Sequence, residues 1–511
     1  MRQGPARTLL TFLMIALLIA GCKPGNEAPA LTATQPQASA ETLPPPVVHL
    51  ATQPPTSPES QPAPNPSPAP AAGIQPAPGP RTHYELQVNM DYYSRYANVV
   101  QKISYTNTTG SELSQIPLHV PPLYFPGAFN LGSLSTQPAS TYRQQEQTIW
   151  LDLASPLSRD ALLEIDVVFR LVMPNQAATF GATDQQTNLV NWYPYIPAYL
   201  AEKGFIMHAP VYDNTKQVYV GEYIVNDLAD FDVSLSLSNR PELIEVAASA
   251  EAQGEPKSGK YRYHLEAARG FAFSISDSYF INEVQEGAYT IRSYSFINHE
   301  NAGTGEAILP IAAQAMRLFE DLLYPYQRDL ISIVVADYLH NMEMDGMVML
   351  SYGVFDFFDQ TPKNNLTILT PHELSHQWFY SVVGNDQALE PWLDESIATY
   401  SELLYYERYH PDLVSWWWDQ RVDVHNPSGY VNPSTENSGG YDAYRNGVYL
   451  QGARFLQELR GAMGDAAFFA ALKDYASAMA WKLGTRADFE ASFARHSSTD
   501  LAPIYAKYFI P

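Results

Sequence analysis

The spacing of apolar residues changes near residue 300, and this change limits the folds that the chain can adopt. Before it, apolar and polar residues alternate in short segments such as Tyr84–Val88, which is typical of half-buried strands. After it, apolar residues recur at helical spacing, beginning with Glu306–Leu323, and a β-branched run at Ile331–Ala336 predicts one buried strand. The sequence therefore predicts a multidomain α+β protein, with a β-rich part before a mainly helical part.

The length of the chain predicts more than one folded domain. A chain of 511 residues is too long for one ordinary hydrophobic core. We expect a leader at residues 1–21, a tether at 22–81, a β-rich domain at 82–298 and a mainly helical domain at 299–511. Further strands are predicted at Val99–Tyr105, Leu162–Leu171, Phe231–Leu237, Tyr261–Leu265 and Tyr289–Phe296, and a polar loop at about His425–Gly447 interrupts the last helices.

The N-terminal residues have the pattern of a bacterial lipoprotein leader. Arg2 and Arg7 precede an apolar run, Leu9–Ala20, that is shorter than a membrane-spanning helix. The run ends in Ile19-Ala20-Gly21-Cys22, which resembles a lipobox, and Cys22 is the chain's only cysteine. We expect an extracytoplasmic protein, held by a lipid on Cys22 to a bacterial membrane at the cell surface or in the periplasm. An ordinary signal peptide with an incidental cysteine is the alternative.

The segment that follows Cys22 is rich in proline and small residues up to about residue 80. This composition keeps a chain extended and cannot bury enough apolar surface to fold, so the segment is predicted to be a disordered tether. The formal net charge of the chain is −24, and no run of Lys or Arg offsets it. Because phosphate binding needs clustered positive charge, nucleic acid is not an expected partner.

The residues His372-Glu373-Leu374-Ser375-His376 form an HExxH sequence. On a helix, residues four apart lie on one face, so both imidazoles can bind one ion. Glu373 lies about 100° further around the helix, where its carboxylate can accept a proton from water and pass it to a leaving amine. The motif is typical of peptidases in which Zn²⁺ polarises the scissile carbonyl and acidifies water. A surface helix with two solvated histidines is the alternative.

A third candidate ligand follows in a second helical segment that begins at Trp392. Eighteen residues separate Glu395 from His376, which leaves room for a helix end, a loop and a return. A His₂Glu set holds one Zn²⁺ and leaves its fourth position open. The sequence therefore predicts one zinc ion per chain, bound by His372, His376 and Glu395.

Together, the HExxH pair, the 18-residue interval and the run Trp392-Leu393-Asp394-Glu395-Ser396 resemble the aminopeptidase N-like gluzincins. That resemblance continues in His376-Gln377-Trp378-Phe379, and Trp192-Tyr193-Pro194 and Ala229–Val233 are similar to landmarks of the family's first domain. It implies a zinc exopeptidase with a β-saddle or sandwich domain before a thermolysin-like catalytic domain. Because few residues follow Tyr449, the family's C-terminal helical superdomain is expected to be missing or much reduced, which would leave a more open cleft.

Two further sites are implied by the resemblance. The segment around Glu343 resembles the Gly-x-Met-Glu-Asn motif, whose Glu binds the substrate's free α-amino group; here His340, Asn341 and Met344 depart from the family pattern. Glu343 is expected on an edge strand beside the cleft, with Met342 in the substrate pocket and His340 as a neighbouring candidate. A solvated strand carboxylate is the alternative for Glu343.

Tyr449-Leu450-Gln451-Gly452-Ala453 resembles a family helix start whose tyrosine faces the oxyanion, with Tyr444 as the fallback candidate. Thr399 lies one turn after Glu395, where it could orient that ligand or be an ordinary helix residue. Trp416-Trp417-Trp418 is predicted to pack a helix. We predict a zinc aminopeptidase that acts on peptides with a free N-terminus. A related zinc endopeptidase and a non-catalytic binding lipoprotein are the alternatives.

Overall fold

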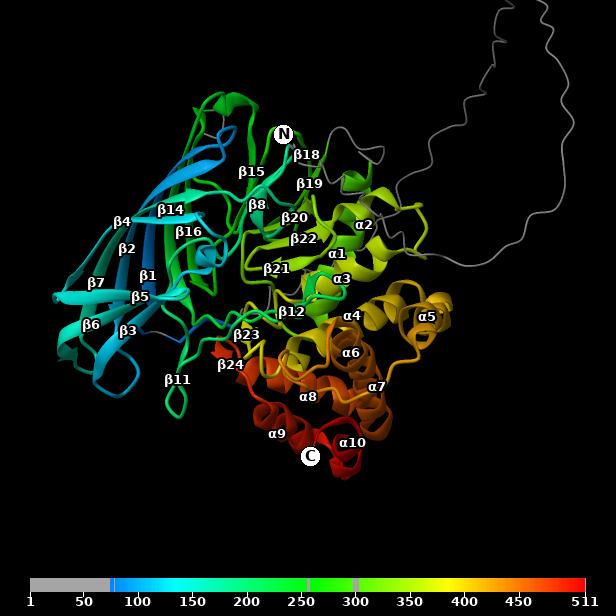
Figure 1. Ribbon diagram of the computed structural model, residues 1–511. Helices are drawn as coiled ribbons and strands as arrows, with labels where there is room; N and C mark the ends of the chain where they lie inside the picture. Colours follow the sequence, from blue (N-terminus) through cyan, green and yellow to red (C-terminus); the bar gives the residue numbers. More distant parts are fainter. Residues whose placement is uncertain (1–73, 78, 255–257, 297–302, 511) are drawn as a thin grey trace, which may run out of the picture. The chain divides into compact units, whose positions relative to one another are not determined.

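The computed structural model describes residues 74–77, 79–254, 258–296 and 303–510 (Figure 1). These residues belong to one compact unit, Pro68–Pro511. The predicted leader, Cys22 and nearly all of the predicted tether lie outside the described residues. Within the described ranges, no helix combines the length and the apolar character needed to cross a membrane.

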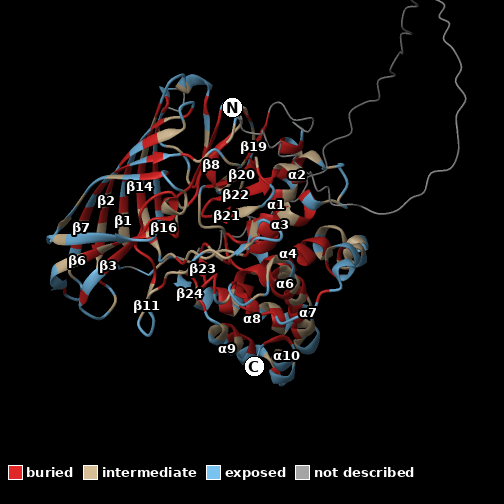
Figure 2. Cartoon of the chain, viewed as in Figure 1, coloured by how far each residue is buried: buried red, intermediate tan, exposed pale blue. Residues whose placement is uncertain are grey.

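A six-stranded sheet forms the body of the β-rich part, in the order β16-β14-β1-β2-β7-β4. β1 pairs in parallel with β14, and the other neighbours are antiparallel. Buried and exposed residues alternate along these strands, as the sequence pattern predicts (Figure 2). The strands are β1 (Thr82–Asp91), β2 (Tyr96–Thr106), β4 (Phe129–Gln137), β7 (Leu162–Val172), β14 (Ala229–Ser238) and β16 (Lys260–Ala268).

Two smaller sheets complete the β-rich part, in the orders β3-β6-β5 and β15-β17-β9-β8. Aromatic side chains fill the core between the layers, where Tyr84 stacks on Phe231 and Tyr193 packs against both. The strands of these sheets are β3 (Leu113–His119), β5 (Ser140–Gln145), β6 (Thr148–Leu157), β8 (Phe180–Ala182), β9 (Thr187–Leu189), β15 (Glu245–Ala248) and β17 (Phe273–Ser276). Short pairs join β10 (Tyr199–Leu200) to β11 (Gly204–Phe205) and β12 (Tyr212–Asp213) to β13 (Val218–Tyr219).

A five-stranded sheet links the two parts of the chain, in the order β18-β19-β20-β22-β21. Its strands are β18 (Tyr279–Glu286), β19 (Tyr289–Phe296), β20 (Leu330–Ala336), β21 (Met342–Met344) and β22 (Met347–Ser351). All residues of β20 are buried, in agreement with the predicted buried strand. β18 and β19 precede the predicted domain boundary at residue 298, and the other three strands of this sheet follow it. The boundary itself stays a prediction. β21 is the edge strand, so Glu343 lies on an edge strand as expected.

Helices occupy most of the chain after residue 303. α1 contacts β18 and β19 on one side and α3 on the other. A further β-pair joins β23 (Val383–Gly384) to β24 (Lys482–Leu483). The α-helices are α1 (Thr304–Leu322), α2 (Tyr352–Asp356), α3 (Asn365–Ser375), α4 (Trp392–Tyr409), α5 (Val414–Trp417), α6 (Tyr441–Tyr444), α7 (Gly452–Met463), α8 (Asp465–Ala478), α9 (Arg486–His496) and α10 (Ala502–Tyr508).

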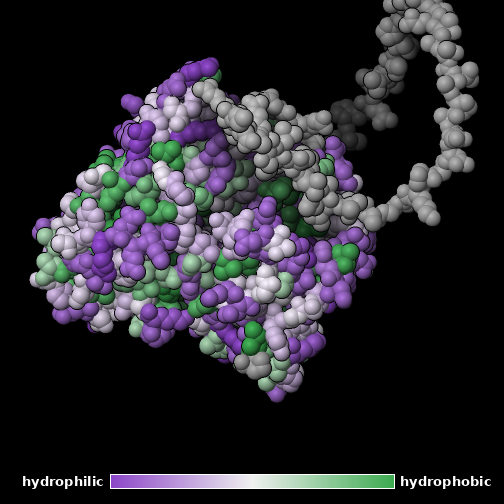
Figure 3. Space-filling view, in the orientation of Figure 1, coloured by the Kyte–Doolittle hydropathy of each residue, from purple (hydrophilic) through white to green (hydrophobic). Residues whose placement is uncertain are grey.

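The predicted loop at about His425–Gly447 is shorter than expected. α6 begins at Tyr441 and continues into a π-helical segment, η7 (Arg445–Gln451), and then into α7. Gly447 makes this possible, because a Cβ there would lie 2.3 Å from the backbone oxygen of Tyr430. On the face shown in Figure 3, hydrophilic residues are widespread and hydrophobic residues form scattered groups between them, which suits the acidic composition.

Candidate active site

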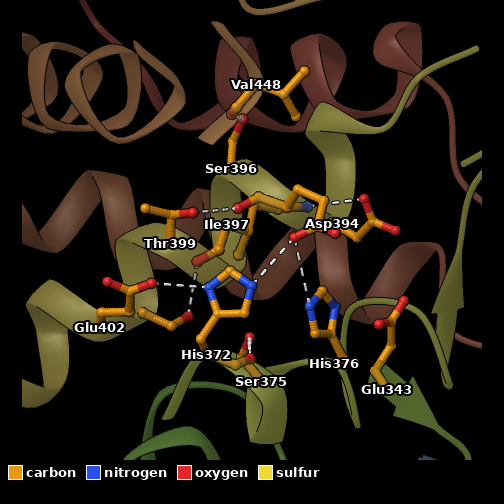
Figure 4. A network of polar contacts seen from close by, with 12 residues as sticks. Glu343, His372, Ser375, His376, Asp394, Ser396, Ile397, Thr399, Glu402 and Val448 are labelled. Atoms are coloured by element: carbon orange, nitrogen blue, oxygen red, sulfur yellow. Dashed lines mark hydrogen bonds and ion pairs between the residues drawn. The ribbon is translucent and has the colours of Figure 1, made fainter. Parts of the chain in front are cut away.

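Two packed helices, α3 and α4, bring the predicted metal ligands together (Figure 4). The side chain of Asn364 caps α3 by accepting a hydrogen bond from the Thr367 backbone N–H at 3.0 Å. His372 lies in the last turn of α3 and His376 at its C-cap, while Glu395 lies in the first turn of α4. The Glu395 Oε2 atom is 3.2 Å from His372 Nε2 and 3.8 Å from His376 Nε2.

The geometry of these three side chains fits a zinc-sized cation. Each offers one ligand atom, all three atoms lie within 4.8 Å of one another, and all three residues are buried. Tetrahedral ligands at about 2.0–2.1 Å from Zn²⁺ lie roughly 3.3 Å apart, close to the separations seen here. Burial acts to raise the pKa of Glu395, but His372 and His376 outweigh it and hold that pKa below its usual value.

A buried carboxylate that the sequence analysis missed orients His372. Glu402 Oε1 is 2.9 Å from His372 Nδ1, and a hydrogen bond at that nitrogen leaves Nε2 facing Glu395. Arg421 binds both oxygens of Glu402 at 2.8 Å, and Trp417 Nε1 donates to Oε2 at 3.1 Å. Burial acts to raise the pKa of Glu402, but Arg421 and His372 outweigh burial and hold that pKa below its usual value. This carboxylate is therefore ionised.

The structure bears on two secondary predictions about nearby residues. Thr399 Oγ1 donates to the backbone oxygen of Glu395 at 2.8 Å, so Thr399 is a helix residue rather than a contact of the ligand's carboxylate. Trp417 packs as expected and also binds Glu402. Glu402 follows Glu395 by seven residues, which is two turns of one helix face, and that spacing is only a partial signal of its role in the sequence.

Glu373 lies beside the candidate metal ligands. A Glu373 oxygen, a Glu343 oxygen and a nitrogen of His376 lie within 4.8 Å of one another. Burial raises the pKa of Glu373 to about 8; His372 opposes this shift and Glu395 adds to it. Glu373 therefore lies where it can exchange protons with a ligand at the metal site, and its raised pKa makes its carboxylate a stronger base than an exposed one.

The side chain of Glu343 is held by Gln387, in the loop that precedes α4. Gln387 Nε2 donates to Glu343 Oε1 at 3.0 Å and to Asp394 Oδ2 at 3.2 Å. Burial raises the pKa of Glu343, and the charges of Glu395 and Glu373 raise it further. Such a group of buried carboxylates favours positively charged ligands. Asn341, which departs from the family pattern, accepts a hydrogen bond from the Ser351 backbone N–H at 3.0 Å.

Tyr449 lies beside His372 of the candidate metal site. Its ring stacks on the ring of His372, with centroids 5.9 Å apart and an interplanar angle of 6°. Burial raises the pKa of Tyr449, so its hydroxyl stays protonated and can donate a hydrogen bond. The fallback candidate, Tyr444, packs edge-on against Tyr449, and its hydroxyl lies close to Gly221 in the β-rich part.

All the predicted site residues line or form one cleft of about 740 Å³. Its walls come from residues 210–224 of the β-rich part, the strand region 338–345, α3, α4 and the helix that includes Tyr449. His340 and Met342 line it as expected. Glu222, which no sequence motif indicated, also lines it, and burial and the nearby charges of Glu343 and Glu395 raise the pKa of its carboxyl.

Residues 308–508 match the Peptidase family M1 domain. This chain carries a peptidase M1 domain. The predicted resemblance to the aminopeptidase N-like peptidases is confirmed. Aminopeptidase N of Lactobacillus delbrueckii subsp. lactis is 28% identical over 211 residues, or 38% of this chain and 25% of that protein. Endoplasmic reticulum aminopeptidase 1 of Homo sapiens is 23% identical over 244 residues, or 45% and 26%. The chain thus spans about a quarter of the length of these relatives.

Solved structures confirm the predicted fold class of the chain around its M1 domain. An M1 zinc metallopeptidase from Deinococcus radiodurans aligns with a TM-score of 0.59 and 17% identity, over 84% of this chain and 94% of that one. A mutant of that peptidase bound to a Tyr-Ser-Ala substrate aligns with a TM-score of 0.58, over 84% and 95%. The β-rich part followed by a helical part is therefore shared with compact M1 structures.

Proposed function

We propose that this chain is a zinc aminopeptidase that removes N-terminal residues from peptides. The observation that carries the proposal is the position of Glu343: its buried carboxylate lies within 4.8 Å of Glu373 and His376, beside the candidate metal ligands. An ammonium group bound there would place the first peptide bond of a substrate at the metal site. The relatives named aminopeptidases and the zinc metallopeptidase structures support the same assignment.

Each side chain of the site then has a defined task. His372, His376 and Glu395 would hold one Zn²⁺, which supplies a Lewis acid that polarises a carbonyl and acidifies water. Glu373 accepts a proton from the attacking water and delivers it to the leaving amine. Tyr449 donates a hydrogen bond to the oxyanion that develops on the carbonyl oxygen. Glu343 pairs with the substrate ammonium, and Met342 lines the pocket beside it.

The aminopeptidase proposal is tested by Glu343→Gln. The new amide can still accept a hydrogen bond from Gln387, so the change removes charge while keeping shape. We expect kcat/KM for peptides with a free α-amine to fall by about 2–3 kcal/mol, or roughly 30- to 150-fold. Zinc content should stay at one per chain, and N-acetylated peptides should be poor substrates of both proteins.

A zinc endopeptidase predicts the opposite substrate pattern. It would cut N-acetylated peptides well in their interior, and Glu343→Gln would change kcat/KM little. Efficient internal cleavage of a blocked peptide by the wild type would therefore exclude the aminopeptidase assignment and leave a zinc hydrolase. A binding lipoprotein without catalysis would cleave neither substrate.

We also propose that the enzyme acts outside the cytoplasm, anchored by a lipid on Cys22. The lipobox-like sequence supports this, because a lipid attached to its cysteine supplies affinity for a membrane. Cys22→Ser should move the protein out of the membrane fraction or block its processing, as measured by fractionation and N-terminal mass. A cleaved Cys22→Ser protein that stays tightly in the membrane fraction would contradict the proposal.

A further inference from the structure

Arg445 lines the cleft at the first position of the π-helical segment η7. Its Nε atom is buried and has no hydrogen-bond partner within the described part of the chain, while Nη2 donates to Asn446 Oδ1 at 3.1 Å. No ion pair joins Arg445 to a described carboxylate. An unpaired cation at a partly buried site raises the free energy of the protein. Binding of an anion by Arg445 would therefore be favourable.

The neighbouring charges are already neutralised by other partners. Arg421 is bound by both oxygens of Glu402. Asp442 pairs with Lys216 of the β12–β13 hairpin at 2.6 Å, and Asp213 of that hairpin accepts a hydrogen bond from the Tyr441 backbone N–H at 2.9 Å. The hairpin thus holds the start of α6 in place. Its Lys216 pairs with Asp442, the acidic residue closest in sequence to Arg445.

The charge of Arg445 acts on its surroundings. Burial lowers the pKa of the nearby His425, the charges of Arg445 and Arg421 lower it further, and the charge of Asp442 opposes them. Of these two arginines, Arg421 is paired with Glu402, whereas Arg445 has no ion pair with a described carboxylate.

The helix that carries Tyr449 connects Arg445 to the candidate metal site. Glu343 lies close to His376, whereas Tyr449 stacks on His372, one helical turn away on α3. Arg445 lies four residues before Tyr449 on the same cleft-lining helix, about one turn further on. A peptide whose ammonium binds Glu343 and whose first carbonyl faces Tyr449 can therefore extend towards Arg445.

We propose that Arg445 binds a carboxylate on the leaving-group side of the substrate, and that this carboxylate is the C-terminus of a short peptide. The inference rests on the proposed aminopeptidase function and adds a specificity-determining residue to it. One helical turn is about 5 Å, and an extended peptide rises roughly 3.5 Å per residue, so dipeptides and tripeptides have the matching length. A guanidinium can bind a carboxylate through two parallel hydrogen bonds.

The test compares the tripeptide Ala-Ala-Ala as a free acid with its C-terminal amide. The wild type should show a kcat/KM for the acid that is roughly 10- to 100-fold higher than that for the amide. Arg445→Gln should bring this ratio close to one, while Arg445→Lys should keep part of it. Arg454→Gln is the matched control, because Arg454 pairs with the exposed Asp423 outside the cleft, and it should keep the wild-type ratio. Zinc content and Tm are measured for every variant.

A second substrate pair separates the two possible sources of the carboxylate. If Ala-Ala-Glu-amide is preferred over Ala-Ala-Gln-amide, and Arg445→Gln removes that preference, Arg445 binds an acidic side chain instead of the C-terminus. Equal wild-type cleavage of acid and amide with no preference for Glu, or an unchanged ratio in Arg445→Gln, would overturn the inference. Both results leave the aminopeptidase proposal intact, because the substrates are still cut from a free N-terminus. Failure to cleave any free-amine peptide would end both proposals.

Discussion

Glu373→Gln is expected to lower kcat by about 10²- to 10⁴-fold, the range that a positioned general base contributes. Glutamine keeps the shape of the side chain in its buried position but cannot accept a proton. The candidate metal ligands are untouched, so zinc should remain at about one per chain. Steady-state kinetics on a tripeptide, together with metal analysis of the same preparation, measure both quantities.

Glu320→Gln is a matched control for this change. Glu320 is a half-buried carboxylate on α1 that accepts hydrogen bonds from the Tyr326 backbone N–H and, at 3.4 Å, from the Tyr289 hydroxyl. It lies outside the cleft, so its replacement should leave kcat close to the wild-type value. If Glu373→Gln kept a wild-type kcat, the base would have to be another group. If it lost zinc, Glu373 would support the metal site instead of proton transfer.

Local patterns in the sequence were enough to predict the main elements of the fold. Alternation along Tyr84–Val88 and Phe231–Leu237 corresponds to β1 and β14, because each of these strands has one buried face. The fully apolar run Ile331–Ala336 corresponds to β20, which is buried on both faces. The start of α6 and η7 was not predictable in this way, since it depends on the close approach of Gly447 to Tyr430 and on the contact of Tyr441 with Asp213.

The site residues that were predicted follow from local sequence patterns, and those that were missed depend on contacts between distant segments. His372 and His376 are four residues apart and share one helix face, and the 18 residues that separate His376 from Glu395 allow a second helix to return to it. Glu402 needed one more piece of information, namely that Arg421 packs against α4 and makes a buried carboxylate tolerable there. Glu222 and Arg445 belong to no motif, and they reach the cleft only because the β-rich part and the last helices fold around it.

His372→Ala is expected to abolish zinc binding and activity together. It removes one of three ligands and leaves two, which cannot hold Zn²⁺ at the affinity of a complete set. Glu402 keeps its two hydrogen bonds to Arg421 and the bond from Trp417, so its buried charge keeps its partners and the fold should survive. Metal analysis, the Tm and activity with added zinc measure the three outcomes.

Two further variants grade this effect. Glu402→Gln removes a charged partner of His372 but keeps all three ligands, so zinc affinity should fall by about 10- to 100-fold and activity should return when zinc is added in excess. His340→Ala removes a cleft histidine that belongs to no candidate metal group, and it should keep full zinc. Zinc affinity is expected to be highest in His340→Ala, lower in Glu402→Gln and lowest in His372→Ala. A His372→Ala protein with one tightly bound zinc would show that the ion is held elsewhere, and the ligand assignment would then be wrong.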